Sequence, residues 1–252
     1  MKLRTIIILT IVMLMLSITV TASMLIPSSD KAKEHAKAPE KSPAIGDDWE
    51  LERIDFVHYA KPDWAVKPPK IPKTETCYKL MGVKWKSFPV DYVINPTNND
   101  GLSESFVVNT ISTSAETWDI VTSSELFSDS YGIDYTVQYG VYDYQNSIVF
   151  GDYPESGVIG VTSVWYTRKG KEIVEFDMLL DTDFTWGDAE LNTNLMDLEN
   201  IMTHELGHAV GLSDLYSDAC SAVTMYGYSN YGEISKRSLE QPDITGLQEM
   251  YG

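Results

Sequence analysis

Residues 204–214 read HELGHAVGLSD, and this stretch decides how the rest of the chain is interpreted. His204 and His208 are four residues apart, so on a helix their imidazoles lie one above the other and can reach a single metal ion. Glu205 is adjacent in the sequence, close enough to act on a metal-bound water rather than to bind the metal. The stretch therefore predicts a helix that carries a reactive metal site.

The end of this helix offers a third ligand. Gly211 can take a left-handed conformation that ends the helix sharply, and the turn that follows returns Asp214 toward the two imidazoles. Two neutral imidazoles and one carboxylate leave a divalent ion with net positive charge and an open position for water. Glu233 stays open as an alternative third ligand, although Gly232-Glu233-Ile234 shows no helical motif around it.

The N-terminal part differs in composition from the rest of the chain. Residues 1–22 carry Lys and Arg at the start and then an uncharged apolar run, which predicts a secretory signal peptide. An uncleaved membrane anchor stays open, because about 20 apolar residues can span a bilayer. Residues 23–76 are rich in Pro, Lys, Glu and Ala and predict a linker or a propeptide, within which residues 49–59 form a short apolar island that could dock on a folded domain.

The uneven distribution of charged side chains indicates that the folded domain lies after residue 76. The whole chain of 252 residues has a formal charge of -18, and residues 77–252 alone hold 8 basic and 27 acidic side chains. Nucleic acid is excluded as a partner, because its phosphates are bound by Lys and Arg. The hydrophobic fraction of 43% is ordinary for a globular domain, which we place at residues 77–252.

Hydrophobic periodicity in residues 77–252 predicts an α+β domain in which one mixed sheet packs on helices. Apolar residues at helical spacing follow Ser103, a candidate cap, and helices are also expected at 195–210 and 242–251. The segments that read as strands are 83–94, 133–141, 147–150, 157–167 and 172–180.

The HExxHxxGxx pattern with a later Met225 resembles the metzincin zinc peptidases, in which a methionine turn lies below the metal. Gly82-Val83-Lys84-Trp85, Trp118-Asp119-Ile120-Val121-Thr122 and the closing stretch 239–252 are similar to the matrixin branch. Most metzincins have a third His where this chain has Asp214, and in this it is similar to snapalysin-type proteases.

The resemblance implies a metzincin (zincin-like) fold: a mixed, twisted sheet of about five strands and three helices, with the active-site helix followed by the methionine turn and a C-terminal helix. It also implies a secreted zinc metalloendopeptidase, with one catalytic Zn²⁺ on His204, His208 and Asp214 and with Glu205 as general base. We expect a protein or peptide substrate to pair with the edge strand 157–167. Tyr226 and Tyr228 are candidates for contacts with the substrate or the transition state.

The chain departs from the matrixin pattern in two ways. Residues 77–252 contain no His besides the pair in the motif, so the second, structural zinc of matrixins is not expected, and no propeptide cysteine motif is present. Calcium is a weaker implication, and a merely solvated acidic face stays open. The acidic side chains that could hold it are Asp152, Glu175, Asp177, Asp181 and Asp183.

The two cysteines, Cys77 and Cys220, most simply form a disulfide in an exported protein. The alternative is that the Cys77 thiolate blocks the metal and keeps the protein latent. We expect a monomer that is secreted, or held at the cell surface if the N-terminal segment is not cleaved; a membrane is a partner only through that anchor. A different class also stays open: a secreted, metal-stabilised binding protein without catalysis, against which Glu205 argues.

Overall fold

The computed structural model describes residues 51–62 and 76–252. The predicted signal peptide, residues 1–22, lies outside the described residues, as does most of the predicted linker or propeptide. None of the helices in the described ranges is long and apolar enough to cross a membrane.

The core of the fold is a mixed sheet with the strand order β3-β2-β4-β6-β5-β1-β9. Its long strands are β1 (Leu51–Ala60), β4 (Ser147–Gly151), β5 (Val158–Thr167) and β6 (Ile173–Asp181), and its short ones are β2 (Val93–Asn95), β3 (Gly132–Ile133) and β9 (Tyr228–Ser229). β4 and β6 run parallel, whereas β5 pairs antiparallel with both β6 and β1. A separate parallel pair is formed by β7 (Trp186–Gly187) and β8 (Met196–Asp197).

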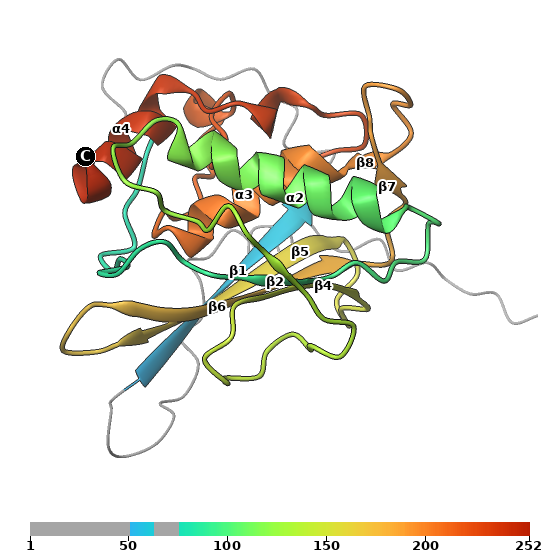
Figure 1. Cartoon of the computed structure of the whole chain (residues 1–252). Helices are drawn as coiled ribbons and strands as arrows, with labels where there is room; N and C mark the ends of the chain where they lie inside the picture. The colour runs from blue at the N-terminus through green and yellow to red at the C-terminus, as the bar shows by residue number, and fades with distance from the viewer. Residues whose placement is uncertain (1–50, 63–75) are drawn as a thin grey trace, which may run out of the picture. The chain divides into compact units, whose positions relative to one another are not determined.

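Helices α2 (Glu104–Asp119) and α3 (Leu198–Ala209) pack against each other on the same side of the sheet (Figure 1). Ser103 caps α2 by accepting a hydrogen bond from the Phe106 amide at 3.1 Å. The apolar positions of α2 at helical spacing are buried, and Trp118 donates its indole N–H to the Thr203 carbonyl of α3 at 2.8 Å. The α+β class and the helical predictions are confirmed, including the closing helix α4 (Gln241–Tyr251) with Pro242 in its first turn.

Helix α3 is buried on nearly all sides, because α2, β5 and the later loops surround it. Asp197 caps its first turn by accepting from the Asn200 amide at 2.8 Å. Gly211 ends it with a φ of 104°, as the sequence predicts, and a Cβ there would lie 2.7 Å from the Val83 carbonyl oxygen. The helix that carries the HExxH pattern is therefore fixed in position at both ends.

Two predicted strands are wrong in extent. In 83–94 only Val93 and Ile94 belong to a strand of the sheet, because Lys84 and Val90 form isolated bridges with Glu172 and Phe127 instead. In 133–141 only Ile133 is in a strand, since the chain then forms a loop across the sheet. The backbone amides of this loop donate to carboxylates and not to a neighbouring strand. Gly140 and Val141 donate to Asp177, and Asp143 and Tyr144 donate to Glu175.

The sheet also has a strand that no strand prediction included. β1 comes from the apolar island 49–59 and pairs along almost its whole length with β5, from Leu51 opposite Thr167 to Tyr59 opposite Val158. At its end Tyr59 and Ala60 pair in parallel with Tyr228 and Ser229. β5 is therefore an inner strand of this sheet, flanked by β6 and β1, and the prediction that strand 157–167 lies at the edge of the sheet is wrong.

Candidate active site

Three side chains converge at the end of α3. The Nε2 atoms of His204 and His208 lie 3.1 and 3.4 Å from the same Asp214 oxygen, Oδ1. All three residues are buried, and within the described ranges His204 Nε2 and Asp214 Oδ1 have no hydrogen-bond partner. Ligand atoms of a tetrahedral zinc ion lie about 3.3 Å apart, given Zn–N and Zn–O distances of about 2.0–2.1 Å. The three residues therefore fit a zinc ion.

The remaining ring nitrogens of both histidines are held by the backbone. His204 Nδ1 donates to the Thr224 carbonyl at 2.7 Å, and His208 Nδ1 donates to the Leu212 carbonyl at 2.9 Å. Each Nε2 is then the nitrogen with a free lone pair, as a metal ligand requires. Burial lowers the pKa of His204 to about 4, which keeps this imidazole neutral at physiological pH.

Asp214 stays ionised in spite of its burial. Desolvation opposes its charge, but the two imidazoles hold the pKa of its carboxyl well below the usual range. Its second oxygen, Oδ2, accepts a hydrogen bond from the Tyr216 hydroxyl at 3.2 Å. Glu233, the alternative ligand, instead accepts from the Asn230 amide and the Ser235 hydroxyl.

Glu205 lies on the same helix and outside the ligand set. Its Oε2 accepts a hydrogen bond from the Thr162 hydroxyl of β5 at 2.6 Å, and its Oε1 lies 3.1 Å from His58 Nδ1 of β1. Burial raises the pKa of Glu205 to about 7. A carboxylate with such a pKa can both take up and release a proton near neutral pH.

Met225 forms the floor below the two histidines. A Cβ added to Gly207, between them on the helix, would lie 2.3 Å from Met225 Sδ and 2.7 Å from a ring carbon of Trp118. Only glycine therefore allows α3 to lie this close to the methionine turn.

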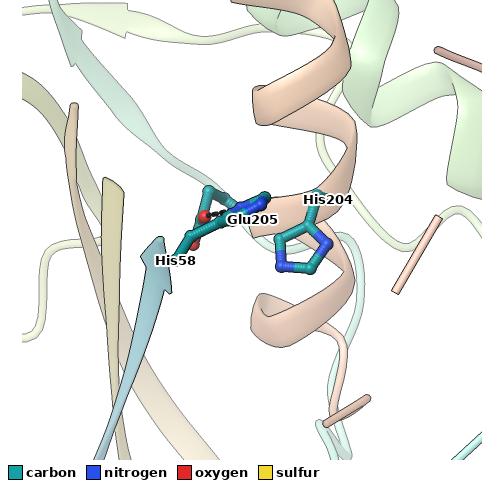
Figure 2. A group of neighbouring side chains, drawn as sticks. All are labelled: His58, His204 and Glu205. Atoms are coloured by element: carbon teal, nitrogen blue, oxygen red, sulfur yellow. Dashed lines mark hydrogen bonds and ion pairs between the residues drawn. The ribbon is translucent and has the colours of Figure 1, made fainter. Parts of the chain in front are cut away.

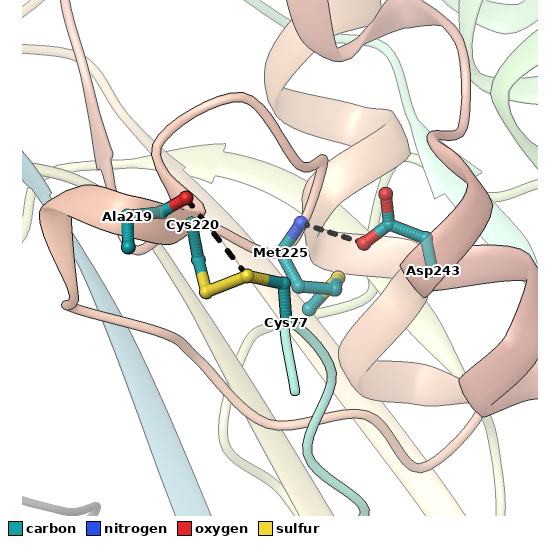
Figure 3. Close-up of a disulfide and its surroundings, with 5 residues drawn as sticks. All are labelled: Cys77, Ala219, Cys220, Met225 and Asp243. Carbon is teal, nitrogen blue, oxygen red and sulfur yellow. Dashed lines mark hydrogen bonds between the residues drawn. A yellow bond between two sulfur atoms is a disulfide. The ribbon is translucent and has the colours of Figure 1, made fainter. Parts of the chain in front are cut away.

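A carboxylate from the last helix holds this turn in place (Figure 3). Asp243 of α4 is fully buried and accepts from the amides of Thr224 and Met225 at 2.9 and 3.2 Å. Since the Thr224 carbonyl orients His204, Asp243 acts on the ligand set through the turn. The sequence reasoning missed Asp243, although its place in the first turn of α4 marked it as a capping residue.

The disulfide lies next to the same turn. Cys77 is bonded to Cys220, which ends the short helix η2 (Asp218–Cys220), and the bridge spans a sequence separation of 143 residues (Figure 3). Cys77 therefore does not reach the metal ligands as a free thiolate, which is a correction to the alternative of a blocking thiol. In the chain-entropy model a loop of this length is worth about 5 kcal/mol of stability.

Strand β1 brings His58 into the centre of the site (Figure 2). Its ring is buried and lies 4.0 Å, between centroids, from the ring of His204. Its second nitrogen, Nε2, lies 3.4 Å from the ammonium of Lys236, which follows the loop after β9. Two residues earlier in β1, Phe56 stacks on His208 with ring centroids 4.0 Å apart. The sequence reasoning assigned no role to Phe56, His58 or Lys236.

The other predicted residues lie near the site or away from it. Tyr226 and Tyr228 pack edge to face, 5.7 Å apart, and Tyr228 belongs to the strand that pairs with β1. Of the acidic side chains proposed for calcium, Asp152, Asp181 and Asp183 come together, whereas Glu175 and Asp177 face the loop 140–144 instead. The carboxyl oxygen Oδ2 of Asp181 is buried, and among the described residues it has no hydrogen-bond partner.

Comparison with known proteins gives the family. The model of the matrixin family (Peptidase_M10) matches residues 84–252. Matrix metalloproteinase-25 of Mus musculus is 27% identical over 180 residues, which cover 69% of this chain and 28% of the relative. Stromelysin-1 of Mus musculus is 35% identical over 77 residues, 30% of this chain and 15% of the relative.

A plant relative also matches: metalloendoproteinase 4-MMP of Arabidopsis thaliana is 29% identical over 125 residues, which cover 46% of this chain and 34% of the relative. The chain thus spans about a third or less of the length of these relatives. The family match covers the sheet apart from β1, the HExxH helix, the methionine turn and the closing helix, and the chain belongs to the matrixin family.

Proposed function

We propose that this protein is a secreted, zinc-dependent endopeptidase that hydrolyses peptide bonds in proteins or peptides. The convergence of His204, His208 and Asp214 on one point, with two buried ligand atoms that lack any other partner, carries the proposal. The position of Glu205 beside this ligand set separates a hydrolytic site from a purely structural one.

Zinc held by these three residues would supply a Lewis acid that polarises the scissile carbonyl and lowers the pKa of a water molecule. Glu205 accepts the proton that the attacking water loses and returns it to the leaving amine. Its pKa of about 7 suits both transfers. Thr162 holds one carboxylate oxygen, and the other oxygen, which faces His58 of β1 in this structure, is the one proposed to take part in the transfer.

A polypeptide substrate would lie extended along β5 in the place that β1 holds in this structure, because β5 is not the free edge strand that was expected at 157–167. Backbone pairing with a sheet edge gives affinity that depends little on sequence, and it holds a peptide bond beside Glu205. Tyr228 is proposed to contact the substrate, because its strand borders the same space, and Tyr226 supports Tyr228 through ring packing.

Export and a monomeric state complete the proposal. The disulfide Cys77–Cys220 supports an oxidising compartment, because such bonds persist in secreted proteins. If the proposal holds, the protein is found in the culture medium of cells that express the full chain. Its mass there is that of a monomer, and it is lower than the mass of the whole chain if residues 1–22 are removed.

The first experiment measures zinc. The purified protein is expected to hold one zinc ion per chain, and Asp214→Asn is expected to weaken its affinity, measured by competition with a chromogenic chelator. The matched control is Asp218→Asn, four residues later, whose carboxylate contacts the Tyr226 hydroxyl and not the ligand set. Zinc binding that is unchanged in Asp214→Asn refutes the ligand assignment.

The second experiment separates catalysis from metal binding. Glu205→Gln is expected to keep the zinc and to lose hydrolysis of a fluorogenic peptide library by a factor of about 10²–10⁴. Because residues 51–60 cover β5, hydrolysis is measured with and without a specific cut in residues 63–75. Glu199→Gln, on the same helix but paired with Arg237, is the control and should leave the rate unchanged. A zinc-loaded, cut protein that cleaves no peptide would leave a metal-stabilised binding protein.

We also propose a cation at Asp152, Asp181 and Asp183, because the buried Asp181 oxygen Oδ2 has no hydrogen-bond partner among the described residues. Calcium should then raise the melting temperature, and Asp181→Asn should abolish this rise. An equal rise in the variant would assign the effect to the acidic surface as a whole.

A further inference from the structure

The two carboxylate oxygens of Asp214 have different partners. Oδ1 lies 3.1 and 3.4 Å from the Nε2 atoms of His204 and His208, and among the described residues it has no hydrogen-bond partner. Oδ2 instead accepts a hydrogen bond from the Tyr216 hydroxyl at 3.2 Å. The carboxylate is therefore shared between the two imidazoles and a phenol that follows it by two residues in the chain.

The backbone after Asp214 brings Tyr216 to this position. The Leu215 amide donates to the Met225 carbonyl, and the Gly227 amide donates to the Leu215 carbonyl, both at 2.9 Å. The segment is thus extended and runs beside the methionine turn, with a parallel bridge at Leu215. In an extended segment, residues two positions apart point to the same side, so Asp214 and Tyr216 face each other's surroundings.

Two neighbours fix the ring of Tyr216. A Cβ added to Gly227 would lie 2.4 and 2.7 Å from two of its ring carbons, so only glycine leaves room for the phenol at this place. Tyr228 packs against the ring edge to face, with the centroids 5.2 Å apart. Packing therefore holds the hydroxyl at Asp214, as expected of a group that orients a metal ligand.

The hydrogen bond matters because a carboxylate can bind a metal ion through one oxygen or through both. If both Asp214 oxygens bound the ion, they would fill the position that a hydrolytic zinc site keeps open. A hydrogen bond to Oδ2 favours binding through Oδ1 alone, and it also draws negative charge away from the ligand oxygen. The ion then keeps its open position and more of the positive charge with which it polarises a carbonyl group.

We propose that Tyr216 is a positioning residue whose hydroxyl keeps Asp214 bound to the metal through a single oxygen. In this role Tyr216 acts through Asp214 and not on the substrate. The inference rests on the proposed function for its effect on hydrolysis, whereas the number of ligand oxygens can be measured without catalysis. A residue that only packed against Gly227 and Tyr228 would need its ring and not its hydroxyl, so Tyr216→Phe separates the two roles.

The test uses the full chain loaded with Co²⁺ in place of zinc, because the visible absorption of high-spin Co²⁺ is weaker when the ion has five ligands than when it has four. In Tyr216→Phe the oxygen Oδ2 loses its donor, and both oxygens are expected to bind the metal. The visible band of the variant should therefore be weaker than that of the wild type at saturating cobalt. Identical spectra overturn the proposal, whatever the substitution does to stability.

Tyr78→Phe is the matched control. It also removes a single phenol hydroxyl, one that donates to Glu249 of the last helix at 2.9 Å and not to the ligand set. Its cobalt spectrum should be that of the wild type. A band that weakens equally in Tyr78→Phe and Tyr216→Phe would assign the change to the loss of any hydroxyl, and it would overturn the proposal.

A double-mutant cycle with Asp214→Asn gives a second measurement. The amide nitrogen of Asn neither accepts the hydrogen bond from Tyr216 nor binds a metal, so this side chain has a single oxygen to offer in either case. Tyr216→Phe should then leave the cobalt spectrum of Asp214→Asn as it is. A spectral change of the same size in both backgrounds would come from packing alone and would overturn the proposal.

Hydrolysis is the last readout, measured with zinc at saturation after the cut in residues 63–75. Tyr216→Phe should lower kcat by about 10–100-fold and leave KM unchanged, because the metal and not the substrate contacts is affected. An unchanged kcat overturns the proposal. A weaker cobalt band in Tyr216→Phe, together with a wild type that cleaves no peptide, would support the role of Tyr216 at the metal and refute the proposed peptidase.

Discussion

Asp243→Ala tests whether the last helix controls the metal site. The carboxylate accepts three backbone N–H groups: those of Thr224 and Met225 in the methionine turn, and that of Glu240 in a capping box. Loss of the cap costs about 1 kcal/mol. Each of the two buried amides left without an acceptor costs about 1–3 kcal/mol. The free energy of unfolding should therefore fall by about 3–7 kcal/mol.

The metal site should respond as well, because the Thr224 carbonyl would no longer be held against His204. Loss of a group that orients a ligand typically weakens metal affinity about 10–100-fold. Urea unfolding of the zinc-free protein and competition with a chromogenic chelator measure the two effects separately. Asp243→Asn, which keeps an accepting oxygen, serves if the alanine variant does not fold, and it should lose less in both assays.

Glu240→Ala is the matched control, since it removes the other half of the same capping box and touches neither the turn nor the site. It should cost about 1 kcal/mol and leave the zinc affinity unchanged. If Asp243→Ala loses no more stability than Glu240→Ala and binds zinc as tightly as the wild type, the link from α4 through the turn to His204 is refuted.

Three further predictions concern the frame around the site. Burial raises the pKa of Glu175 to about 8, so the folded state holds a proton that the unfolded state has released; the free energy of unfolding should fall as the pH rises from about 4.5 to 8, and urea midpoints of Glu175→Gln should show a flatter profile. Replacing Cys77 and Cys220 by Ser should lower the stability by up to about 5 kcal/mol, and a reducing agent should then have no further effect; an unchanged midpoint would contradict the loop-closure argument. Gly211→Ala forces a positive φ on a residue with a Cβ that meets the Val83 carbonyl, so stability should fall by about 1–3 kcal/mol, and zinc affinity should fall with it because Asp214 follows three residues later; calorimetry with and without zinc measures both.

The family match begins at residue 84, so the residues of β1 lie outside it, and yet β1 is one of the longest strands of the sheet. A comparison restricted to the matched residues would leave β5 at the edge of the sheet. The segment before the matched region therefore contributes side chains to the site that the family match does not cover.

The sequence alone determined the parts of the protein that depend on local spacing. Two histidines four residues apart, a glycine that ends the helix and an aspartate three residues later bring the side chains of the candidate metal site together, because helix geometry converts these spacings directly into positions in space. The same holds for α2, whose apolar positions recur at helical spacing behind a capping serine, and for α4 with its early proline.

The tertiary structure decided what depends on residues far apart in the chain. Asp177 and Glu175 turn a predicted strand into a loop, because their carboxylates compete with a strand partner for its amides. His58 lies 147 positions from Glu205 in the sequence and contacts it only because β1 pairs with β5 in the folded sheet. Pairing between strands depends on which edge is free in the folded sheet, and no local pattern in a proline-rich segment encodes that choice.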